Sequence, residues 1–574
     1  MTNSEIANFL YELAEMLEIV GETRFRIVAY EQAAHIVENL PEELSDIYKE
    51  KGIGGLTDIK GIGQSIAEKI AEIITTGKSK YYQELSKKVP KQELNLIKIP
   101  GIGPKTAQKL YTRFKIKNIK DLEKIALKGK IRKLSGFNTI TEENILANIK
   151  RLKKREKRLL ISFAEPIAEE CLVALKKCRF VEKCEMVGSL RRMKETIGDI
   201  DLVASSEKPN SVINYFIKQS FVKKIKAQGT AKVSIIHRKG IAIDLEILPP
   251  KDSGSLLQHL TGSKEHNIHL RKFANNKGLS LSEYGIKTLK TDKIEHFKDE
   301  KKFYKKLGLA YIPPELREDQ GEIEAASKNK LPRLITLKDI KGDLHLHTQW
   351  SEGSSTIEEM ARASLSNGYS YIAITDHTYG LGIANGMDKM TILKQADLIK
   401  KVNKKLKLIK IFSGVEVNIK ADSSLDIADE ILSKLDIVIA SVHSSFHAPE
   451  EKMTERIIKA INNPYVKIIG HPSGRILKKR PSYDVEWEII FKEAAKNNVA
   501  LEINSLPDRL DLKDTLVHEG KRHGLKFAIN TDSHDIAHLE QIKYGISVAR
   551  RGWLEKKDII NTYSSENLVN WLKR

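Results

Sequence analysis

The stretch MVGSLRRMKETIGDIDLV, Met186–Val203, decides how the rest of the chain is organised. Its chemistry-bearing residues form three groups, Gly188-Ser189, Arg191-Arg192, and Asp199 with Asp201. The last pair lies in a strand-like segment, where residues i and i+2 point to the same face. Two neighbouring carboxylates repel each other unless a cation lies between them, and such oxygen ligands suit Mg²⁺ or Mn²⁺.

A third carboxylate, Asp244, lies in a second strand-like segment, IAIDLEIL at 241–248. Three carboxylates on adjacent strands can hold two metal ions, an arrangement that serves phosphoryl transfer. Gly188 would let the backbone approach a phosphate, and the arginines would supply charge-assisted forks. For Asp-x-Asp alone, an edge strand with surface acids is an equal alternative. The surrounding residues favour a catalytic site.

These residues resemble the palm of the family X DNA polymerases, the family of DNA polymerase beta. The segment 256–286 resembles that family's thumb through Thr261-Gly262-Ser263, Asn267, Arg271 and Glu283-Tyr284. The resemblance implies that three catalytic carboxylates bind Mg²⁺ or Mn²⁺, namely Asp199, Asp201 and Asp244. It implies a nucleotide site that uses Gly188, Ser189, Arg192, Thr261, Gly262, Asn267 and Arg271. The family's aromatic pair before Thr-Gly is His259-Leu260 here, which leaves discrimination between deoxy- and ribonucleotides open.

The bulk composition is that of a globular, multidomain protein. A chain of 574 residues, 41% hydrophobic and 30% charged, should hold roughly three or four domains. The net charge of +21 favours a polyanionic partner or a basic groove, although scattered surface lysines are an alternative. The first helix-like stretch contains acids and is unlike a signal peptide, and no apolar run matches a membrane span. The three cysteines have no metal-site spacing, and we expect reduced thiols in a cytoplasmic protein: Cys171, Cys178 and Cys184.

Repeated Gly-Ile-Gly turns lie in the amino-terminal part, which reads as helices. Gly61-Ile62-Gly63 recurs as Gly101-Ile102-Gly103, followed by Pro104-Lys105, and a weaker third copy is Leu134–Phe137. A single copy could be a helix C-cap. Two copies, each at a helix start, predict helix-hairpin-helix modules that bind the DNA backbone through Gly61, Gly63, Gly101, Gly103 and Lys105. The basic stretch Ile149–Arg158 is either a solvated helix face or a DNA-facing element.

The first module resembles the amino-terminal domain of DNA polymerase beta through AYEQAA (29–34) and GIGQSIAEKI (61–70). The resemblance places Lys69 where that relative has a lyase nucleophile, which needs a lowered lysine pKa. Ser65 replaces a supporting lysine of the relative, so a plain phosphate contact by Lys69 is an equal alternative.

From Ile340 onward, seven apolar strand candidates alternate with helices, which predicts a parallel barrel. All seven strand ends carry His, Asp or Glu, six of them of metal-ligand type, and chemistry gathers at such ends. The ends lie near 343–347, 375–377, 414–416, 441–443, 470–471, 502–504 and 531–534. We therefore expect a metal site of mixed imidazoles and carboxylates, which suits Zn²⁺ or Mn²⁺.

This half resembles the PHP (polymerase and histidinol phosphatase) domain, a seven-stranded barrel with up to three metal ions, Zn²⁺ or Mn²⁺. The resemblance implies nine ligands, with Glu416 bridging: His345, His347, Glu352, His377, Glu416, His443, His471, Asp532 and His534. Glu352 departs from the Asp that is usual in polymerase-fused members. Asn504 is either a contact behind the ligands or a strand-end cap.

The predicted fold is a multidomain α/β protein with helix-hairpin-helix amino-terminal domains, a nucleotidyltransferase palm and thumb, and a C-terminal (β/α)7 PHP barrel. The expected segments are a helical DNA-binding domain at 1–85, fingers with the second hairpin at 86–150, palm at 151–255, thumb at 256–317, linker at 318–338 and barrel at 339–574. We expect a monomeric DNA repair polymerase that fills short gaps, with a barrel that removes 3′ nucleotides or blocking groups. Gapped or nicked DNA and dNTPs would be its partners. The alternative is a DNA-anchored phosphatase for a small phosphate ester, with an inactive polymerase half.

Overall fold

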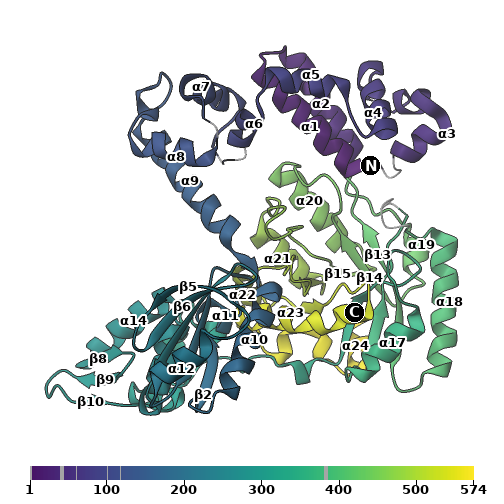
Figure 1. Ribbon diagram of the computed structural model, residues 1–574. Coiled ribbons are helices and arrows are strands. Elements are labelled where there is room, and N and C mark those ends of the chain that lie inside the picture. Colours follow the sequence, from purple (N-terminus) through teal and green to yellow (C-terminus); the bar gives the residue numbers. More distant parts are fainter. Residues whose placement is uncertain are drawn as a thin grey trace.

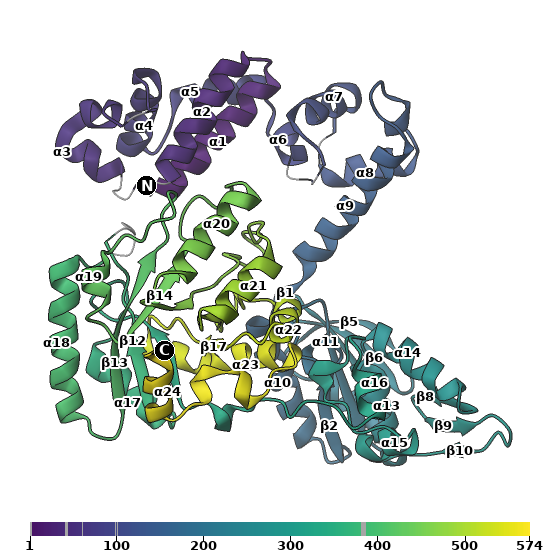
Figure 2. The same ribbon diagram turned by 180° about the vertical axis from the view of Figure 1, so that it is seen from behind.

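The computed structural model describes residues 3–38, 40, 44–59, 61–97, 99, 101–116, 118–379 and 386–573. A layer of helices at the amino-terminal end lies above the rest of the molecule, and the long helix α9 runs down from it to the palm (Figure 1). The barrel lies beside the palm and beneath the first helices, and the same arrangement is seen from behind (Figure 2).

The helical layer contains two small domains, each with its own apolar core. The first comprises α1 (Asn3–Ile19), α2 (Arg24–Glu38), α3 (Leu44–Thr57), α4 (Gln64–Thr76) and α5 (Lys80–Lys88). The second comprises α6 (Lys91–Ile97), α7 (Pro104–Phe114), α8 (Ile119–Leu127), the turn η1 (Ile131–Lys133) and α9 (Thr139–Lys157). The side chain of Gln108 donates to the carbonyl of Ile19 at 2.6 Å and joins the two domains.

The palm is a five-stranded sheet with α10 (Ile161–Lys177) and α12 (Pro209–Phe216) packed against it. The sheet order is β2-β4-β7-β6-β5, and only the β4–β7 pair is parallel. Its strands are β2 (Lys183–Val187), β4 (Ile200–Ser205), β5 (Val222–Gln228), β6 (Lys232–His237) and β7 (Ala242–Leu248). A short helix, α11 (Gly188–Arg191), follows β2, and the ribbon β1 (Leu159–Leu160) with β3 (Thr196–Ile197) leads into β4.

The thumb has a separate core formed by helices and a three-stranded sheet. Its elements are η2 (Pro250–Asp252), α13 (Ser253–Thr261), α14 (Lys264–Asn275), β8 (Leu279–Ser282), β9 (Gly285–Thr288), β10 (Ile294–Glu295), α15 (Glu300–Lys306) and η3 (Pro314–Leu316). The segment expected as a linker, 318–338, is packed rather than extended. It contains α16 (Glu322–Ser327) and buries Ile323, Ala326 and Leu334 in the thumb core.

The barrel follows the turn η4 (Leu337–Asp339) and has seven parallel strands in chain order. They are β11 (Gly342–Leu346), β12 (Tyr371–Ile374), β13 (Lys410–Asn418), β14 (Ile437–Ser441), β15 (Val466–Ile469), β16 (Ala500–Asn504) and β17 (Phe527–Asn530). A bridge between Leu346 and Ser533 links the first strand to the segment after the last. The seven-stranded parallel barrel predicted from the sequence is confirmed.

Helices surround the barrel, and one closes its lower end. The surrounding helices are α17 (Ile357–Ser366), α18 (Lys389–Lys405), α19 (Asp429–Leu432), α20 (Glu450–Ile461), α21 (Trp487–Lys496), α22 (Asp514–Arg522) and α23 (Ile542–Arg551), with the turn η6 (Ile536–Gln541) before α23. The last helix, α24 (Ser565–Leu572), follows the turns η7 (Lys556–Asp558) and η8 (Ile560–Thr562). Its Leu568 and Trp571 pack with inward residues of the strands, such as Leu344 and Phe412. A closed lower end leaves the carboxyl ends of the strands as the open face.

The palm and the barrel share one continuous cluster of buried apolar residues. Across this seam, Lys543 and Tyr544 of α23 donate to Glu165 of α10 at 2.6 and 2.8 Å. None of the helices in the described ranges is both long and apolar enough to span a membrane. The three cysteines are unpaired thiols, and two of them are buried.

Candidate active sites

The palm brings two of the three predicted carboxylates into direct register. Asp201 in β4 pairs with Asp244 in the parallel strand β7, and Asp199 immediately precedes β4. Burial, followed by the charges of Asp199 and Asp244, raises the pKa of Asp201 to about 7. A bound cation would reverse this effect, because it favours the ionised form of every carboxylate around it. The arrangement is that of a carboxylate site for divalent ions.

Gly188 is required by its contact with this cluster. Its φ is +62°, and a Cβ at this position would overlap with Asp201 Oδ2. The glycine opens α11, which carries Ser189 and Arg191, so the start of this helix lies against Asp201. Any side chain at residue 188 would displace Asp201 or the turn.

The two arginines of the palm motif lie between palm and thumb. Arg191 donates to Thr261 Oγ1 at 2.6 Å and forms a fork with Glu300 at 2.9 and 3.1 Å. Arg192 donates to the carbonyl of Thr261 at 2.5 Å and lies against Gly262. The predicted nucleotide residues Arg192, Thr261 and Gly262 are therefore brought together.

The other predicted thumb residues lie on α14. Asn267 donates to the carbonyl of His259 at 2.7 Å and accepts from Gln258 at 2.9 Å, so it fixes the end of α13. Arg271 is exposed one turn further along the helix. His259 is half-buried at the position of the family's aromatic pair.

Arg158 is a palm residue that the sequence singled out only as the end of a basic stretch. Its side chain donates to Thr196, and its guanidinium lies close enough to Asp199 and Arg192 for their charges to affect its pKa. The side chains of 151–157 lie outside the described residues. A charge count along a helix cannot show which arginine turns toward the carboxylates, because the turn after α9 decides it.

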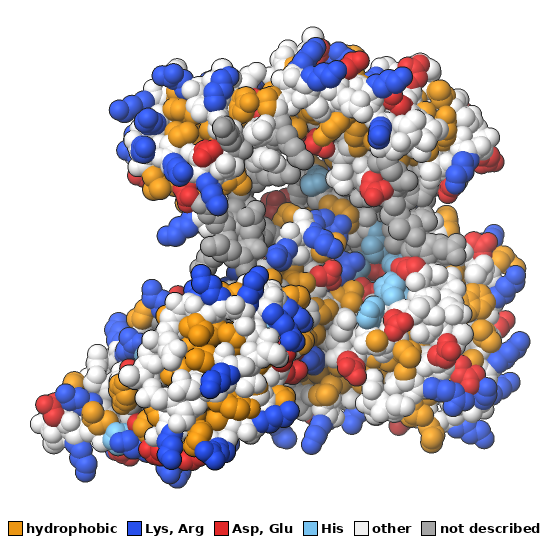
Figure 3. Space-filling view, viewed as in Figure 1, with side chains coloured by type: hydrophobic (Ala, Val, Ile, Leu, Met, Phe, Trp, Pro, Cys, Tyr) orange, Lys and Arg blue, Asp and Glu red, His pale blue; other side chains and the backbone are white. Residues whose placement is uncertain are grey.

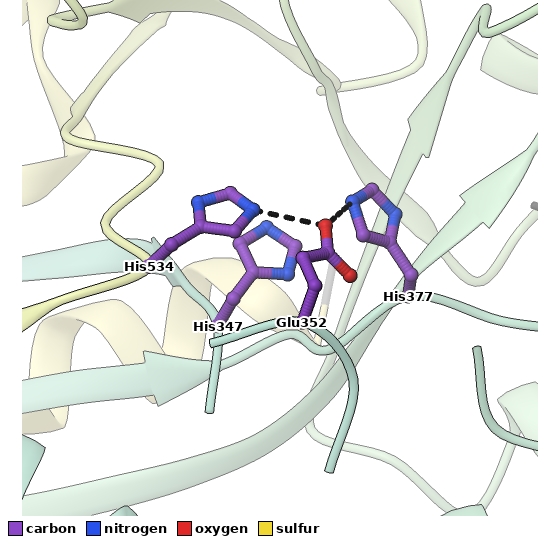
Figure 4. A group of neighbouring side chains, drawn as sticks. All are labelled: His347, Glu352, His377 and His534. Atoms are coloured by element: carbon purple, nitrogen blue, oxygen red, sulfur yellow. Dashed lines mark hydrogen bonds and ion pairs between the residues drawn. The ribbon is translucent and has the colours of Figure 1, made fainter. Parts of the chain in front are cut away.

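In the barrel, all nine predicted ligands lie at the open face. Figure 4 shows Glu352 between two imidazoles: its Oε1 is 2.9 Å from both His377 Nε2 and His534 Nε2. Three groups have ligand atoms within 4.8 Å of one another: His347–Glu352–His377–His534, His345–His347–Asp532 and His377–Glu416–His443. The groups share His347 and His377, so they form one continuous cluster of candidate metal ligands.

Glu416 lies at the centre and is surrounded by five imidazoles, of which His347 is the most distant, at 3.6 Å from Oε2. Its Oε2 is 3.0 Å from His377 Nδ1 and 3.3 Å from His345 Nε2. Its Oε1 is 3.1 Å from His471 Nε2 and 3.3 Å from His443 Nε2. Burial opposes ionisation, but the imidazoles hold the pKa of Glu416 well below its usual range. A carboxylate shared in this way can bridge two metal ions.

Buried polar atoms in this cluster test whether metal ions fit. Several ligand atoms have no hydrogen-bond partner: His345 Nε2, His347 Nε2, His377 Nδ1 and both carboxylate oxygens of Glu416. Buried polar atoms are normally paired, and these converge on one another. Imidazole nitrogens with carboxylate oxygens are a donor set for Zn²⁺ or Mn²⁺. The residues therefore fit a metal centre.

Glu502 orients the centre, although the sequence marked it only as a strand-end residue. It is fully buried and accepts from His345 Nδ1 at 2.7 Å, the His471 backbone N–H at 2.7 Å and the side chains of Asn504 and Asn530. Asn504 also donates to Asp532 at 3.0 Å and accepts from the backbone N–H of Leu506 at 3.0 Å, so it both contacts a ligand and caps the strand end. Strand alternation cannot distinguish a ligand from a residue that orients one.

The three hairpins of the helical layer share one turn geometry. Gly61, Gly101 and Gly136 have φ of 100°, 85° and 88°. In each turn the backbone N–H of the residue after the glycine donates to the carbonyl three residues back. The pairs are Ile62 to Ile59, Ile102 to Ile99, and Phe137 to Leu134, at 2.9 to 3.0 Å. The weak third copy predicted from the sequence is therefore a hairpin of the same geometry.

The helix that follows each hairpin begins differently. Gly63 and Gly103 precede α4 and α7 and provide no side-chain cap, so the first N–H groups of these helices stay available to an anion. Asn138 takes that position in the third hairpin, and its side chain accepts from the N–H of Thr141 at 2.8 Å. Lys105 is exposed in the first turn of α7. The first two hairpins are thus better phosphate sites than the third.

Lys69 lies on α4 beside an aromatic ring. Its Nζ donates to Ser65 O and Oγ at 2.8 and 2.9 Å and lies 4.8 Å from the centre of the Tyr81 ring. Burial and the nearby Arg26 lower its pKa. Ser65 therefore contacts the amine, although it provides none of the charge that a lysine would add.

Comparisons with known proteins agree with this architecture. The DNA polymerase beta thumb model matches residues 256–318, the PHP domain model 343–506, the helix-hairpin-helix domain model 1–79 and the SAM-like helix-hairpin-helix tandem model 93–151. A "Probable phosphatase" of Thermoanaerobacter sp. (strain X514) is 32% identical over 231 residues, 38% of this chain and 89% of its own. A "Probable phosphatase" of Clostridium botulinum (strain Hall) is 28% identical over 240 residues, 40% of this chain and 93% of its own.

A palm and beta-type thumb joined to helix-hairpin-helix modules and a PHP barrel define a family X DNA polymerase with a C-terminal PHP domain. The "DNA polymerase/3'-5' exonuclease PolX" of Bacillus subtilis (strain 168) is 36% identical over 576 residues and covers the whole of both chains. The chain belongs to the family of this enzyme.

Proposed function

We propose that the protein fills short gaps in DNA at the palm and trims 3′ ends at the barrel. The observation that carries the proposal is the presence of two separate sites of metal-ligand type in one chain that also carries paired hairpins. Histidines gather on the barrel beside the hollow beneath the helical layer, and lysines and arginines lie along the neighbouring edge of the palm (Figure 3). A DNA end in this hollow would have access to the barrel site.

At the palm, Asp199, Asp201 and Asp244 would hold two Mg²⁺ or Mn²⁺ ions. Bound there, the ions would supply charge stabilisation for transfer of a nucleotidyl group from a dNTP to a primer 3′ end. Arg192 and the N–H groups around Gly188 would bind the triphosphate, and Arg158 adds a cation beside Asp199. Asn267 and Arg271, on α14, would face the base pair.

At the barrel, the nine ligands would hold up to three Zn²⁺ or Mn²⁺ ions. Bound ions would supply Lewis-acid chemistry for hydrolysis of a phosphodiester. Glu502 and Asn504 would keep the ligands in place, and Glu352 would hold the outer group together. This site would remove a 3′ nucleotide or a blocking group.

The remaining assignments follow from these two sites. Gapped or nicked DNA and dNTPs would be the substrates, with Gly61, Gly63, Gly101, Gly103 and Lys105 gripping the DNA backbone. We propose the domain division given above, with 318–338 counted as part of the thumb, and a monomer that works in the cytoplasm. Lys69 would contact a phosphate or, with the pKa that burial and Arg26 lower, act as a lyase nucleophile.

A gel assay with single-site variants tests the proposal. A 5′-labelled primer on one-nucleotide-gapped DNA is incubated with Mn²⁺, with and without dNTPs. Asp201→Asn should lose extension and keep shortening, and His345→Ala should do the reverse. Glu246→Gln, on the same strand as Asp244, and His523→Ala, away from the ligand cluster, serve as matched controls. Full extension by Asp201→Asn or full shortening by His345→Ala would refute the assignment of that site.

A small phosphate ester as the barrel's substrate is the second candidate, since the two matched phosphatases are of about the length of the barrel alone. The intact carboxylates of the palm and the full-length relative support the DNA assignment instead. If both substrates use one site, gapped DNA should inhibit hydrolysis of a small ester competitively. Ester hydrolysis that DNA leaves unchanged would favour the second candidate.

A further inference from the structure

Helix α23 of the barrel presents a row of polar side chains to the polymerase half. Lys543 and Tyr544, at its start, bind Glu165 of the palm, and Arg550, near its end, donates to Glu315 of η3 at 2.7 Å. Both ribbon views place α23 beside α10 and α11 (Figures 1 and 2). The helix therefore forms the barrel's side of its interface with the polymerase half.

Arg551, the last residue of α23, reaches past this seam to the nucleotide-binding motif. Its Nη1 donates to the backbone carbonyl of Arg192 at 2.8 Å and to Glu318 Oε1 at 3.1 Å, and its Nη2 donates to Asp514 of α22. The side chain of Arg551 is only 4% exposed. A buried guanidinium with three acceptors has a fixed position, because losing any of them leaves an unpaired charge.

Glu318 is shared between Arg551 and Arg192. Its Oε1 accepts from Arg192 Nε at 2.8 Å, and Lys194 lies 3.5 Å from its other oxygen. The Nη1 of Arg192 is held by the carbonyl of Thr261. Glu318 and the carbonyl of Thr261 therefore fix two edges of the Arg192 guanidinium. Glu318 is in turn bound by Arg551 of the barrel.

The charges of this network persist through the neutral pH range. Burial would raise the pKa of Asp514, but Arg551 and Lys194 hold it at about 2. The cations Arg551, Lys194 and Arg192 likewise lower the pKa of Glu318 against the effect of burial. The carboxylates of Asp514 and Glu318 therefore stay ionised beside Arg551 at neutral pH.

We propose that Arg551 is a positioning residue for the polymerase reaction: through Glu318 it sets the guanidinium of Arg192 for the triphosphate of an incoming dNTP. The barrel thereby completes the nucleotide site of the palm. This inference rests on the proposed function, in which Arg192 binds the triphosphate. A pre-set side chain loses less conformational freedom on binding its ligand, so the gain lies mainly in nucleotide affinity.

The test measures single-nucleotide gap filling by the full-length protein over a range of dNTP concentrations. Arg551→Ala should raise KM for the dNTP about tenfold with a smaller change in kcat, as expected when a binding group is misplaced. Arg551→Lys should restore part of the affinity, because it keeps a cation beside Glu318 without the fork. Arg550→Ala is the matched control, since it breaks an ion pair on the same seam without touching Arg192, and its KM should stay at the wild-type value.

Two results overturn the inference. A KM of Arg551→Ala equal to that of Arg550→Ala overturns the inference, and so does a lowered KM, which would mean that Glu318 competes with the triphosphate. If thermal unfolding shows that Arg551→Ala is not folded, Asp514→Asn, which removes one charge that holds Arg551, carries the same test. If the wild-type protein does not fill gaps at all, the proposed function is wrong. That result differs from gap filling in which Arg551→Ala leaves KM unchanged, which contradicts only the role of Arg551.

Discussion

Gly188 is required in the palm site because it has no Cβ. A Cβ at this position would overlap with Asp201 Oδ2, and φ of +62° adds strain for any other residue. Gly188→Ala should therefore reduce gap filling by two orders of magnitude or so and leave 3′ digestion intact. Primer extension and shortening on the same preparation measure both effects. Gly240→Ala, at a palm turn with φ of +85° and open space around it, is the control for backbone strain alone.

Glu502 tests whether groups behind the ligands tune the barrel centre. Its two oxygens take four hydrogen bonds, including that of His345 Nδ1. Glu502→Gln replaces one acceptor oxygen with a donor and should weaken metal binding by about 10- to 100-fold. Metal content after dialysis, measured by mass spectrometry, reads this directly. Metal retained as in the wild type would show that Glu502 only fills space.

The sequence indicates where the two sites lie more completely than it indicates the role of each residue in them. Strand alternation places Asp199 and Asp201 on one face, and clusters of His, Asp and Glu at strand ends indicate a metal site in the barrel. The roles of Asp244 and of the individual barrel ligands, such as Glu352, come from the resemblance to the two families. Glu502 and Arg158 could not be assigned, because their roles depend on which way a side chain points after the strands and α9 are packed. The fork between Arg191 and Glu300 joins residues far apart in the chain and leaves no local pattern.

The hairpins are elements whose effect should be electrostatic. Lys105 is exposed at the start of α7, where the helix N-terminus and its free N–H groups favour a phosphate. Lys105→Ala should weaken binding to gapped DNA equally for all sequences and reduce the slope of log K against log salt by about 1. Fluorescence anisotropy over a salt series measures this. Lys407→Ala, on an exposed barrel loop, should leave the slope unchanged, and an equal loss in both variants would mean diffuse charge only.

Glu300, a buried carboxylate of the thumb, binds Arg191 of the palm, and this contact should depend on pH. Burial opposes ionisation of Glu300, but Arg317 and Arg191 hold its pKa at about 2. Because the folded-state pKa is below the ordinary value, this group stabilises the fold above about pH 4.5, and that contribution declines as pH falls toward 2. Chemical unfolding of Glu300→Gln should show lower stability at pH 7 and a flatter decline below pH 5 or so. Parallel curves for variant and wild type would contradict the assignment.

The barrel and its order of strands could be predicted, but the packing of the segment 318–338 could not. The proline at position 332 and the mixed charge of this segment are typical of a linker, yet Ile323 and Leu334 are buried in the thumb core. The register of Glu318 against Arg192 and Arg551 depends on how three separate elements dock. Local patterns describe elements, and docking is decided by surfaces that come together only in the folded chain.

Across the whole molecule, the two sites are joined by one apolar core and by ion pairs at α23. This arrangement means that the palm and the barrel hold a fixed relation while the helical layer lies above both (Figure 1). Under the proposed function, such a chain would trim a 3′ end at the barrel and then extend it at the palm. A single substrate that must be trimmed before it can be extended tests whether the two steps follow each other.

The deciding measurement uses a gapped duplex whose 5′-labelled primer ends in a 3′-dideoxynucleotide, incubated with Mn²⁺ and all four dNTPs. Such a primer cannot be extended until its last nucleotide is removed. The wild-type protein should yield products longer than the starting primer, His345→Ala should leave the primer unchanged while still extending a normal one, and Asp201→Asn should only shorten it. Longer products from His345→Ala at the wild-type rate would contradict the account, because the 3′ end would then be trimmed somewhere other than the barrel.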